Sequence, residues 1–587
     1  MTAVQPVILC GLNTRHVHTN LALRSLLAYH QARRPEQQLI LVEATINDRP
    51  LSILQTLYQY HAPVYAFSCY IWNIILIRRL SRDLKKLLPD SLIVWGGPEA
   101  AQQAEDFLRR EPAVDLIIRG EGEEAFSVLL DVLTTGTSED LDSVPGLSWR
   151  DRQQDRIHHN PEGRSLAGDA WPFPYNRQTL AENAGRILYY ESSRGCPFSC
   201  SYCLSALDRR VRYRPLDQTL AEINQFLEAD LRQVKFVDRT FNADPARAYA
   251  IWKHIIESDA GRGKTNFHFE VAGDLLDDRS VELLNQAPSG LIQLEIGVQS
   301  IHPDVLAAVN RKTDLDRLAR QVKVLRQGGR VHLHLDLIAG LPGETLEAFG
   351  RSFDFVWALE VDHFQLGFLK VLPGSPMVDQ ARLRGFLWQD EPPYEILASD
   401  GLSFADLTLL KNTAQLLDGF SNSNFYRHSL CFFANRRERP WLFWRALTEW
   451  AVERGWLERP RSPADRALLL LSYIRESEPG LVKDSTEKMI LDLFRLDYQL
   501  SGQKDQPEFL GFAAPENEWE QEIRLHAQQY FKNHHRRSGR LRTDLFSFDV
   551  RRFLKSGELL PDTWAVCFDL STGRPVMLDK CRVNDLY

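Results

Sequence analysis

The first part of the chain, from residue 6 to about residue 135, alternates short apolar runs with longer amphipathic stretches. Five runs have the composition of strands that are buried on both faces: PVILCGL, LILVEA, VYAFSCY, LIVWGG and VDLIIRG. The segments between them, such as Leu21–Gln31 and Trp72–Leu88, have the apolar spacing of helices. The pattern predicts a doubly wound α/β sheet, and a strand order of 2-1-3-4-5 would place its ligand beyond strands 1 and 3.

A second series of strands begins at Ile187 and shows the same alternation. Its six runs are RILYYES, VKFVD, FHFEV, IQLEIG, VHLHLDL and DHFQLGFL, with segments of helical length between them. Six such units predict a partial (βα)6 barrel with its chemistry at the carboxyl ends of the strands. Between the two series, VPGLSWRDRQQDRIHH has the pattern of a β-hairpin, and WPFPYNR has the composition of a connector.

The last third of the chain has a different pattern. Long aromatic-rich amphipathic runs, for example Trp441–Trp456 and Ala464–Glu476, predict helices, and SFDV, WAVCFDL and PVMLD near the C-terminus predict a few strands. We therefore expect four regions: a doubly wound domain over residues 1–140, a linker with a hairpin over 141–180, a barrel over 181–388, and a mostly α-helical domain with short terminal strands over 389–587.

Composition and charge are those of an ordinary globular protein. Apolar residues make up 44% and charged residues 25% of the chain, and no stretch approaches the roughly 18 uninterrupted apolar residues of a membrane-spanning helix. The formal net charge of −8 is mild for 587 residues, so we expect neither a nucleic acid nor a membrane as partner. The N-terminus lacks the pattern of a secretion signal, and we therefore expect a cytoplasmic protein whose eight cysteines are thiols.

Three of the cysteines lie close together in RGCPFSCSYCLS, just after the first strand of the second series. Their spacing is Cys196-x3-Cys200-x2-Cys203. Three thiolates match three irons of a 4Fe-4S cubane and leave the fourth iron to another ligand, such as the amino and carboxylate groups of S-adenosylmethionine (SAM). A structural zinc site is the alternative, but such a zinc takes four ligands, and no further Cys or His occurs in the next thirty residues.

The segment RGCPFSCSYC resembles the signature of the radical SAM superfamily, whose members cleave SAM to methionine and a 5′-deoxyadenosyl radical. FHFEV, EIGVQS and LDLIAGLPGET resemble later strands of the branch that includes oxygen-independent coproporphyrinogen oxidase. The resemblance implies that Tyr202 lies against the adenine and that the backbone near Gly340 approaches it. It also implies that Glu270, Gln299 and Asp336 contact the SAM amino group or ribose; polar caps on strand ends are the alternative.

The loops after the first-domain strands are unusual. NTRHVHTN follows strand 1 and CYIWN follows strand 3, while Gly96 and Gly97 follow strand 4 and GEGE follows strand 5. This GGP and GEGE pattern, in front of a radical SAM core, resembles the cobalamin-binding domain of B12-dependent radical SAM enzymes. The resemblance implies that Ser68 faces the dimethylbenzimidazole tail, that the tail passes the two glycines, and that Gly120 and Glu121 also contact the cofactor.

The lower ligand of the cobalt stays open. The cobalt-binding pattern Asp-x-His-x-x-Gly is not intact, since its nearest match begins at His16, continues with His18 and ends on a leucine. His18 could coordinate cobalt through a neutral imidazole, or it could be a hydrogen-bonded loop histidine. Tyr70, Trp72 and Asn73 could instead line the lower face of the corrin and exclude water, although core packing would explain them equally well.

Together these features predict a B12-dependent radical SAM methyltransferase. It would transfer a methyl group from methylcobalamin to an unactivated carbon, or less often to phosphorus, after the 5′-deoxyadenosyl radical abstracts a hydrogen atom. A rearrangement, oxidation or cyclisation without methylation, using the same cofactors, is the first alternative. The second is methylthiolation, whose enzymes need three more N-terminal cysteines, whereas only Cys10 and Cys69 occur there.

The expected cofactors are one 4Fe-4S cluster, SAM and cobalamin. The expected partners are a small-molecule or peptide substrate and an external one-electron donor such as flavodoxin or ferredoxin. The helical third region resembles a domain of unknown function found after some B12 radical SAM cores, and its aromatic residues would suit either the barrel mouth or a packed core. Cys431, Cys567 and Cys581 are too far apart in the sequence to indicate a second cluster.

Overall fold

The computed structural model describes residues 6–135, 138–151, 156–259, 264–423, 425–479, 485–503, 505–512, 521, 525, 541–569 and 574–576, so Cys581 lies outside the described residues. The chain divides into two compact units. The N-terminal unit contains residues 1–345 and 367–403, and the C-terminal unit contains residues 346–366 and 404–587. No helix in the described ranges combines the length and the apolar content that a membrane crossing requires.

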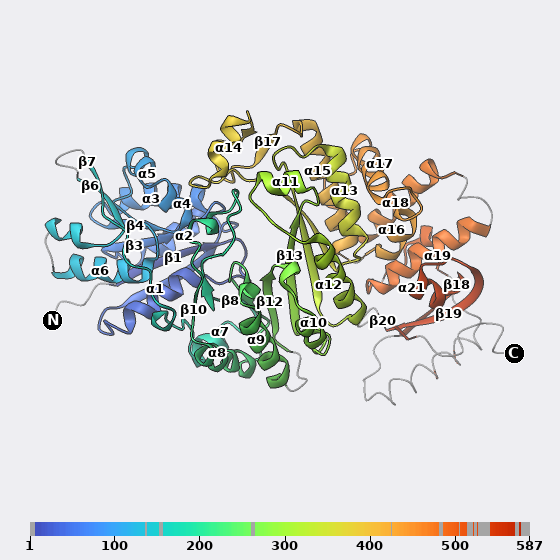
Figure 1. Ribbon diagram of the computed structural model, residues 1–587, viewed down its shortest axis with the longest axis horizontal. Helices are drawn as coiled ribbons and strands as arrows, with labels where there is room; N and C mark the ends of the chain where they lie inside the picture. Colours follow the sequence, from blue (N-terminus) through green and yellow to red (C-terminus); the bar gives the residue numbers. More distant parts are fainter. Residues whose placement is uncertain are drawn as a thin grey trace. The chain divides into compact units, whose positions relative to one another are not determined.

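The N-terminal unit begins with a seven-stranded sheet of order β2-β1-β3-β4-β5-β6-β7 (Figure 1). Its strands are β1 Val7–Asn13, β2 Leu39–Thr45, β3 Val64–Ser68, β4 Leu92–Gly96, β5 Leu116–Ile118, β6 Leu147–Asp151 and β7 Arg156–His159. The first five coincide with the five apolar runs and pair in parallel in the predicted order 2-1-3-4-5. β6 and β7 form the predicted hairpin, which extends the sheet beyond β5 with antiparallel strands.

Helices pack on both faces of this sheet, because its parallel strands are apolar on both sides. They are α1 Leu21–Gln31, α2 Pro50–Tyr58, α3 Ile74–Leu87, α4 Pro98–Gln102, α5 Ala104–Arg110 and α6 Gly122–Thr135. Successive residues of β1 face opposite sides: Ile8 and Cys10 belong to the core formed with α2 and α3, whereas Val7 and Leu9 belong to the core formed with α1 and α6. The prediction of a doubly wound domain is confirmed.

The second sheet has six strands in the order β15-β14-β13-β12-β11-β8, which is sequential along the chain. They are β8 Ile187–Tyr190, β11 Gln233–Phe236, β12 Asn266–Val271, β13 Ile292–Gln299, β14 His332–Ala339 and β15 His363–Phe368. Strands β8 to β14 pair in parallel, and all six predicted runs are strands, as a partial barrel requires. Helices between and after these strands are α8 Leu216–Glu228, α9 Pro245–Ser258, α10 Asp278–Leu284, α11 Pro303–Ala308, α12 Leu315–Gly328, α13 Leu346–Trp357 and α14 Met377–Leu383.

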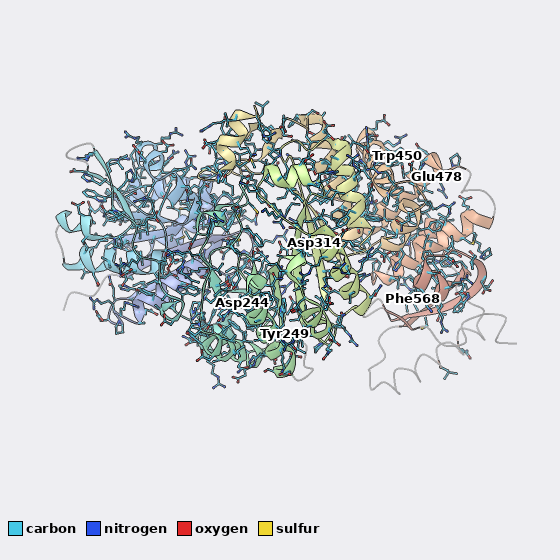
Figure 2. The ribbon with its side chains drawn as sticks, viewed as in Figure 1. Asp244, Tyr249, Asp314, Trp450, Glu478 and Phe568 are labelled. Atoms are coloured by element: carbon cyan, nitrogen blue, oxygen red, sulfur yellow. The ribbon has the colours of Figure 1, made fainter. Side chains whose placement is uncertain are left out.

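Two aspartates mark the starts of barrel helices (Figure 2). The carboxylate of Asp244 accepts a hydrogen bond from the backbone amide of Arg247 in the first turn of α9. Asp314 does the same for the backbone amide of Arg317 in α12. Each cap satisfies an amide that has no partner within its helix and contributes about 1 kcal/mol. The caps thereby fix where α9, which follows β11, and α12, which follows α11, begin.

The loop that carries the three close cysteines is held by a short antiparallel ladder that the sequence pattern did not indicate. The ladder joins β9 Ser193–Arg194 to β10 Arg212–Tyr213 and encloses residues 195–211, called the cysteine loop below. Gly195 has a φ of +92°, and a Cβ added there would lie 2.3 Å from the carbonyl oxygen of Arg210. Strands of two residues are too short to show an apolar alternation, which is why the pattern missed them.

The described part of the C-terminal unit is mostly helical, as predicted. Besides α13 it contains α15 Phe404–Leu417, α16 Arg427–Ala434, α17 Pro440–Glu453, α18 Pro463–Ser477, α19 Ser485–Leu500 and α21 Val550–Ser556, with an antiparallel sheet of β18 Leu541–Phe548, β19 Pro561–Asp569 and β20 Arg574–Val576. The expectation that SFDV is wholly a strand is wrong. Val550 begins α21, because the Asp549 carboxylate accepts the backbone amide of Arg552 and caps that helix. The end of PVMLD lies outside the described residues.

Gly97, at the end of the first sheet, has no room for a side chain. Its φ is +102°, and an added Cβ would lie 2.7 Å from the carbonyl oxygen of Cys69. We expect Gly97→Ala to lower the free energy of unfolding by about 1–3 kcal/mol, because residues with a Cβ are strained in this conformation. Thermal unfolding of the variant and the wild type measures the loss.

Gly96→Ala is the matched control, since the nearest atom to a Cβ at Gly96 is the carbonyl oxygen of Ile118, at 3.9 Å. We expect this variant to unfold at an unchanged or slightly higher temperature. Equal losses in the two variants would contradict the strain at Gly97.

Candidate active site

A cavity of about 870 Å³ lies at the carboxyl ends of the strands of the first sheet. Its walls come from the loops after β1, β3, β4 and β5 and from the carboxyl ends of β8, β11 and β12 in the second sheet. This is the position that the strand order predicts for a ligand. Nine of the predicted cofactor-binding residues line the cavity: His18, Ser68, Tyr70, Trp72, Gly96, Gly97, Gly120, Glu121 and Glu270. Six others lie off its walls: His16, Asn73, Tyr202, Gln299, Asp336 and Gly340.

A buried hydrogen bond joins the loops at the ends of β1 and β3. The side-chain amide of Asn20 donates to Ser68 Oγ at 2.8 Å, and Asn20 Oδ1 accepts the backbone amide of Leu23 at the start of α1. The backbone amide of Asn20 donates to Glu43 on β2. Sequence reasoning had singled out Ser68 but not Asn20. An asparagine directly before a helix is the signal that could have identified it.

The two candidate histidines of the loop after β1 have different surroundings. His16 is exposed, and its Nε2 lies 3.3 Å from Asp48 Oδ1. His18 lines the cavity, and its Nδ1 lies 2.7 Å from the hydroxyl of Tyr189 on β8. Burial and neighbouring cations lower the pKa of His18, which favours the neutral imidazole that a metal ligand requires. Of the two, His18 is the one placed to meet a ligand in the cavity.

The loop after β3 places two stacked aromatic rings at the cavity. The ring centroids of Tyr70 and Trp72 lie 4.3 Å apart, with an interplanar angle of 7°. Asn73 is buried, and all its side-chain bonds hold the backbone: its amide donates to the carbonyls of Leu12 and Ser68, and its Oδ1 accepts the amide of Tyr70. Asn73 therefore fixes this loop and does not itself line the cavity.

The three clustered cysteines all lie on the cysteine loop as free thiols. Cys196 and Cys200 are buried, and Cys203 is partly exposed. Cys196 Sγ lies 3.5 Å from the hydroxyl of Thr240, and the guanidinium of Arg311 donates to Cys200 Sγ at 3.9 Å. Two of the three sulfur atoms thus have a polar neighbour from another element of the barrel. Neither Thr240 nor Arg311 carried a signal in the sequence, because both come from distant parts of the chain.

Two further predicted SAM contacts lie on different elements. Tyr202 belongs to the cysteine loop, and Gly340 directly follows β14. Burial raises the pKa of Tyr202, whose side chain interacts with Arg311 and with Cys200. The phenol is therefore neutral at physiological pH and offers an aromatic face and one hydroxyl. Gly340 follows β14 with a φ of +93°, and an added Cβ would lie 2.9 Å from a side-chain carbon of Ile396. Glycine is required there for the turn.

Arg194, which precedes the cysteines, is surrounded by carboxylates. It lies 3.1 Å from Glu121 and 2.6 Å from Glu123, both in GEGE after β5, and 2.8 Å from Glu191 at the end of β8. Arg212 on β10 also pairs with Glu121. Glu121 thus lies on the cavity wall and at the same time binds the two arginines that flank the cysteine loop. Nothing in the sequence pattern had indicated this contact.

The inner face of the second sheet is polar. Adjacent strands β11 to β14 contribute Lys235, His268, Glu295 and His334 in that order. Lys235 Nζ lies 3.1 Å, and His268 Nε2 lies 2.9 Å, from Glu295 Oε2. Burial opposes the ionisation of Glu295, but the close contact with His268 and the charge of Lys235 hold its pKa well below the usual range. The carboxylate is therefore ionised inside the barrel.

The predicted SAM contacts Glu270, Gln299 and Asp336 lie toward the carboxyl ends of the adjacent strands β12, β13 and β14. Burial and the charges of Glu295 and Glu270 raise the pKa of Asp336 to about 8. Burial also raises the pKa of Glu270. Gln299 has a φ of +68°. A Cβ added at Gly297 would lie 2.1 Å from the side-chain nitrogen of Gln299, so the glycine provides the space that this side chain occupies.

These residues fit the expected groups chemically. Three free thiols on one loop, one of them hydrogen-bonded to a guanidinium, can ligate three irons of a cubane cluster. The cavity is of ligand-binding size, with stacked rings and exposed glycine backbone that suit a large planar ligand. Leu204 and Ser205, directly after Cys203, line the same cavity as Trp72. The three cysteines themselves are not among the lining residues, so a ligand of the first sheet would lie beside the segment that follows Cys203.

Family models match three successive regions of the chain. The B12 binding domain matches residues 9–130, the Radical SAM superfamily matches residues 190–356, and a protein family of unknown function (DUF4080) matches residues 384–568. The first match covers the five parallel strands of the first sheet, and the second covers the cysteine loop with β11 to β14. The third covers most of the helical region.

Relatives of known name match about half of the chain. It is 27% identical over 339 residues to 2-(S-pantetheinyl)-carbapenam-3-carboxylate methyltransferase of Streptantibioticus cattleyicolor, covering 55% of this chain and 49% of that protein. It is 28% identical over 335 residues to the cobalamin-dependent radical SAM methyltransferase TokK of Streptomyces tokunonensis, covering 54% and 48%. It is 26% identical over 306 residues to tRNA-2-methylthio-N(6)-dimethylallyladenosine synthase of Psychrobacter sp., covering 50% and 58%. The chain thus spans about half the length of these relatives.

Among solved structures, the cobalamin-dependent S-adenosylmethionine radical enzyme OxsB with aqua-cobalamin bound has a similar fold. The TM-score is 0.60 at 16% sequence identity, and the match covers 91% of this chain and 81% of that one. At this identity the likeness establishes a shared fold.

The raised pKa of Asp336 predicts a pH dependence of stability. With a pKa of about 8 in the folded chain and about 4 in the unfolded chain, the folded chain alone holds this proton between those values. Stability therefore falls with rising pH across this window, by up to about 1.4 kcal/mol per pH unit from this group. We expect Asp336→Asn to lose less stability than the wild type between about pH 6 and pH 8 in urea unfolding.

The control is Asp379→Asn on α14, whose side chain is 85% exposed. The stability of this variant should change between about pH 6 and pH 8 by the same amount as that of the wild type. A pH dependence of Asp336→Asn equal to that of the wild type would show that Asp336 is ionised in the folded chain.

Proposed function

Because the chain combines a B12 binding domain, a radical SAM domain and a DUF4080 region, it belongs to the cobalamin-dependent radical SAM enzymes, and we propose that it is a methyltransferase of this class. When bound, the cluster supplies the electron that cleaves SAM to a 5′-deoxyadenosyl radical, and methylcobalamin supplies the methyl group for the substrate atom that has lost hydrogen. An unactivated carbon is the proposed acceptor; phosphorus is the less frequent one.

One observation carries the proposal: the single cavity that is lined both by the carboxyl ends of the first sheet and by residues of the cysteine loop. Methyl transfer to a short-lived radical requires the methyl donor and the site of radical formation to be close together. Trp72 and Gly96 line the same cavity as Leu204 and Glu270, so the two domains supply one chamber for both groups.

We assign the cofactor contacts to the residues that the geometry favours. Cys196, Cys200 and Cys203 would hold the cluster, and Thr240 and Arg311 would stabilise its charged sulfur ligands. The proposed SAM contacts are Tyr202, Glu270, Gln299, Asp336 and Gly340. The proposed corrin contacts are His18, Ser68, Tyr70, Trp72, Gly96, Gly97, Gly120 and Glu121. His16 and Asn73 are left out, because His16 faces Asp48 and Asn73 holds the backbone.

The chain's own contribution is binding, orientation and the exclusion of water. Hydrogen-atom abstraction needs no general base, so the titratable groups of the barrel serve as donors and acceptors. The raised pKa of Asp336 keeps much of its carboxyl protonated near neutral pH, and the neutral acid can donate one hydrogen bond. The stacked rings of Tyr70 and Trp72 offer an apolar surface that keeps solvent away from a bound corrin.

The proposal extends to partners and domain limits. A small-molecule or peptide substrate and an external one-electron donor, such as flavodoxin or ferredoxin, complete the reaction in the cytoplasm. Relatives named as methyltransferases, one of a carbapenam and one described as cobalamin-dependent, support the choice of reaction. We place the domain limits near residues 140, 180 and 388.

Methylthiolation, the reaction of the tRNA relative, is disfavoured by the surroundings of the N-terminal cysteines. Cys10 and Cys69 are both buried in one core of the first sheet. Burial raises the pKa of Cys10 to about 12 and that of Cys69 well above its usual value. Two protonated thiols in an apolar core cannot hold a second cluster.

The products of SAM turnover test the proposed reaction. After anaerobic reconstitution with iron, sulfide and hydroxocobalamin, we expect about four irons and one corrin per chain. Turnover with dithionite should give both 5′-deoxyadenosine and S-adenosylhomocysteine, since one SAM would be cleaved to the radical and a second SAM would methylate the cobalamin after dithionite has reduced it by one electron to cob(I)alamin. We expect Cys203→Ala to lose SAM cleavage and most of the iron, whereas Cys431→Ala in α16 should keep both.

The SAM products and the iron content distinguish methylation from the two alternative reactions. 5′-Deoxyadenosine without S-adenosylhomocysteine would favour a reaction without methylation. About eight irons per chain would favour methylthiolation. SAM cleavage by Cys203→Ala at the wild-type rate would overturn the cluster assignment.

The aromatic pair after β3 makes a separate prediction for the corrin. We expect Trp72→Ala to weaken hydroxocobalamin binding about threefold to tenfold, because it removes one of two stacked rings from the cavity wall. Titration followed by the corrin absorbance measures the dissociation constant. Iron content should be unchanged, and Trp450→Ala on α17 should bind cobalamin like the wild type. Unaltered binding by Trp72→Ala would mean that the pair only packs the loop.

A further inference from the structure

The cysteine loop carries exposed cationic side chains that do not line the cavity. Leu207, Arg209 and Arg210 are all exposed, and 54% of Leu207 is accessible to solvent. Within the described parts of the chain, neither of these two guanidinium groups forms an ion pair. The next two arginines differ, since Arg212 pairs with Glu121 and Arg214 with Glu222. We call the two exposed arginines, Arg209 and Arg210, the outer patch.

The outer patch is coupled directly to the cysteines through the backbone. The amide of Cys196 donates to the carbonyl oxygen of Asp208 at 3.0 Å. Gly195 packs against the carbonyl oxygen of Arg210, closely enough that a Cβ would lie 2.3 Å from it. The segment between Cys203 and Arg212 therefore lies against the peptide of the first cysteine. Any protein bound to the outer patch would sit one layer of backbone away from the metal ligands.

The same segment has an inner side. Leu204, Ser205, Leu207, Asp208 and Arg212 line the cavity, whereas Arg209 and Arg210 do not. The loop is thus a thin wall between the cavity and the surface that carries the outer patch. Substrate and cofactors approach the inner side, so the outer side is left for a partner that never enters the cavity.

The charge of the outer patch is opposite to that of the chain. Two unpaired arginines stand on a protein with a net charge of −8. An acidic protein would be repelled by the chain as a whole and attracted to this loop, which favours one docking orientation. A patch of two cations suits the small and short-lived interfaces of electron-transfer proteins.

From these contacts we propose that the outer patch is the docking surface for a small acidic protein that donates one electron. The inference rests on the proposed function, which requires such a donor. In the step that it serves, the donor is oxidised by one electron and the cluster held by the cysteines accepts that electron; no atom or proton is transferred to this chain. Arg209 and Arg210 act by positioning the donor and take no part in SAM cleavage.

The test reverses the charge of the outer patch in the full, reconstituted chain. Arg209→Glu/Arg210→Glu is compared with Arg209→Lys/Arg210→Lys, which keeps the charge. Arg232→Glu/Arg330→Glu is the matched control: both arginines are exposed and precede β11 and β14, at the amino-terminal edge of the same sheet. The readouts are the dissociation constant for oxidised flavodoxin by calorimetry, and 5′-deoxyadenosine formation driven by photoreduced flavodoxin or by dithionite.

We expect the Glu variant of the outer patch to bind flavodoxin about tenfold more weakly, with a smaller salt dependence, and to lose a similar factor in flavodoxin-driven turnover. Dithionite-driven turnover should match the wild type, since a small reductant needs no docking surface. The Lys variant and the matched control should stay within about twofold of the wild type in both assays.

Three results would overturn the docking role: unchanged flavodoxin binding by the Glu variant, an equal loss in the matched control, or an equal loss of dithionite-driven turnover. The second would indicate a general charge effect, and the third a structural role of the loop. A wild-type chain that cleaves no SAM with dithionite would count against the proposed function instead, and the calorimetric comparison would still decide the docking surface.

Discussion

The ion pairs of Arg194 are the contact on which the candidate site depends. This arginine stands directly before the cysteine loop, and its partners Glu121 and Glu123 belong to the first sheet while Glu191 belongs to the second. The group is largely buried, and removing one partner from such a pair typically costs about 3–5 kcal/mol because the remaining charge is left uncompensated. Arg212 adds a second link to Glu121. The cysteine loop is thus held against the domain that forms the other half of the cavity.

Parallel strand order explains why one chamber serves both sheets. In a parallel sheet all loops at the carboxyl ends of the strands gather at one edge, and both sheets of the N-terminal unit are mainly parallel. The two edges meet at the cavity. Ser68 and Gly96 of the first sheet line it together with Tyr189 and Glu270 of the second. The glycines at the end of β4 add no side chain at this edge, and the side-chain hydrogen bonds of Asn20 and Asn73 hold its loops in place. Local rules of strand and loop geometry therefore suffice to place the chamber.

Features with a local signal were predictable from the sequence, and features made by distant pairs were not. Buried runs such as PVILCGL and the spacing of the three cysteines gave the strands, their order and the metal-binding loop. Arg311, Thr240 and the carboxylates around Arg194 come from far along the chain, and no spacing rule links them to the cysteines. Asn73 was assigned to the cavity because of its position in an aromatic loop, yet its amide is used by the backbone. At Asp549 a helix cap, which is a local signal, outweighed the alternation that indicated a strand.

The polar row inside the barrel has a consequence for how the chain folds. Lys235, His268, Glu295 and His334 come from four successive strands, and each is accommodated inside because its neighbours are there. If the pairing register of one strand shifted by one residue, its polar side chain would point to the opposite face of the sheet. Its charged partner would then remain buried without an opposite charge beside it. An apolar interior would penalise such a slip far less, because another aliphatic side chain could fill the space. The polar row therefore favours one strand register, because a slipped register would separate Glu295 from Lys235 inside the barrel.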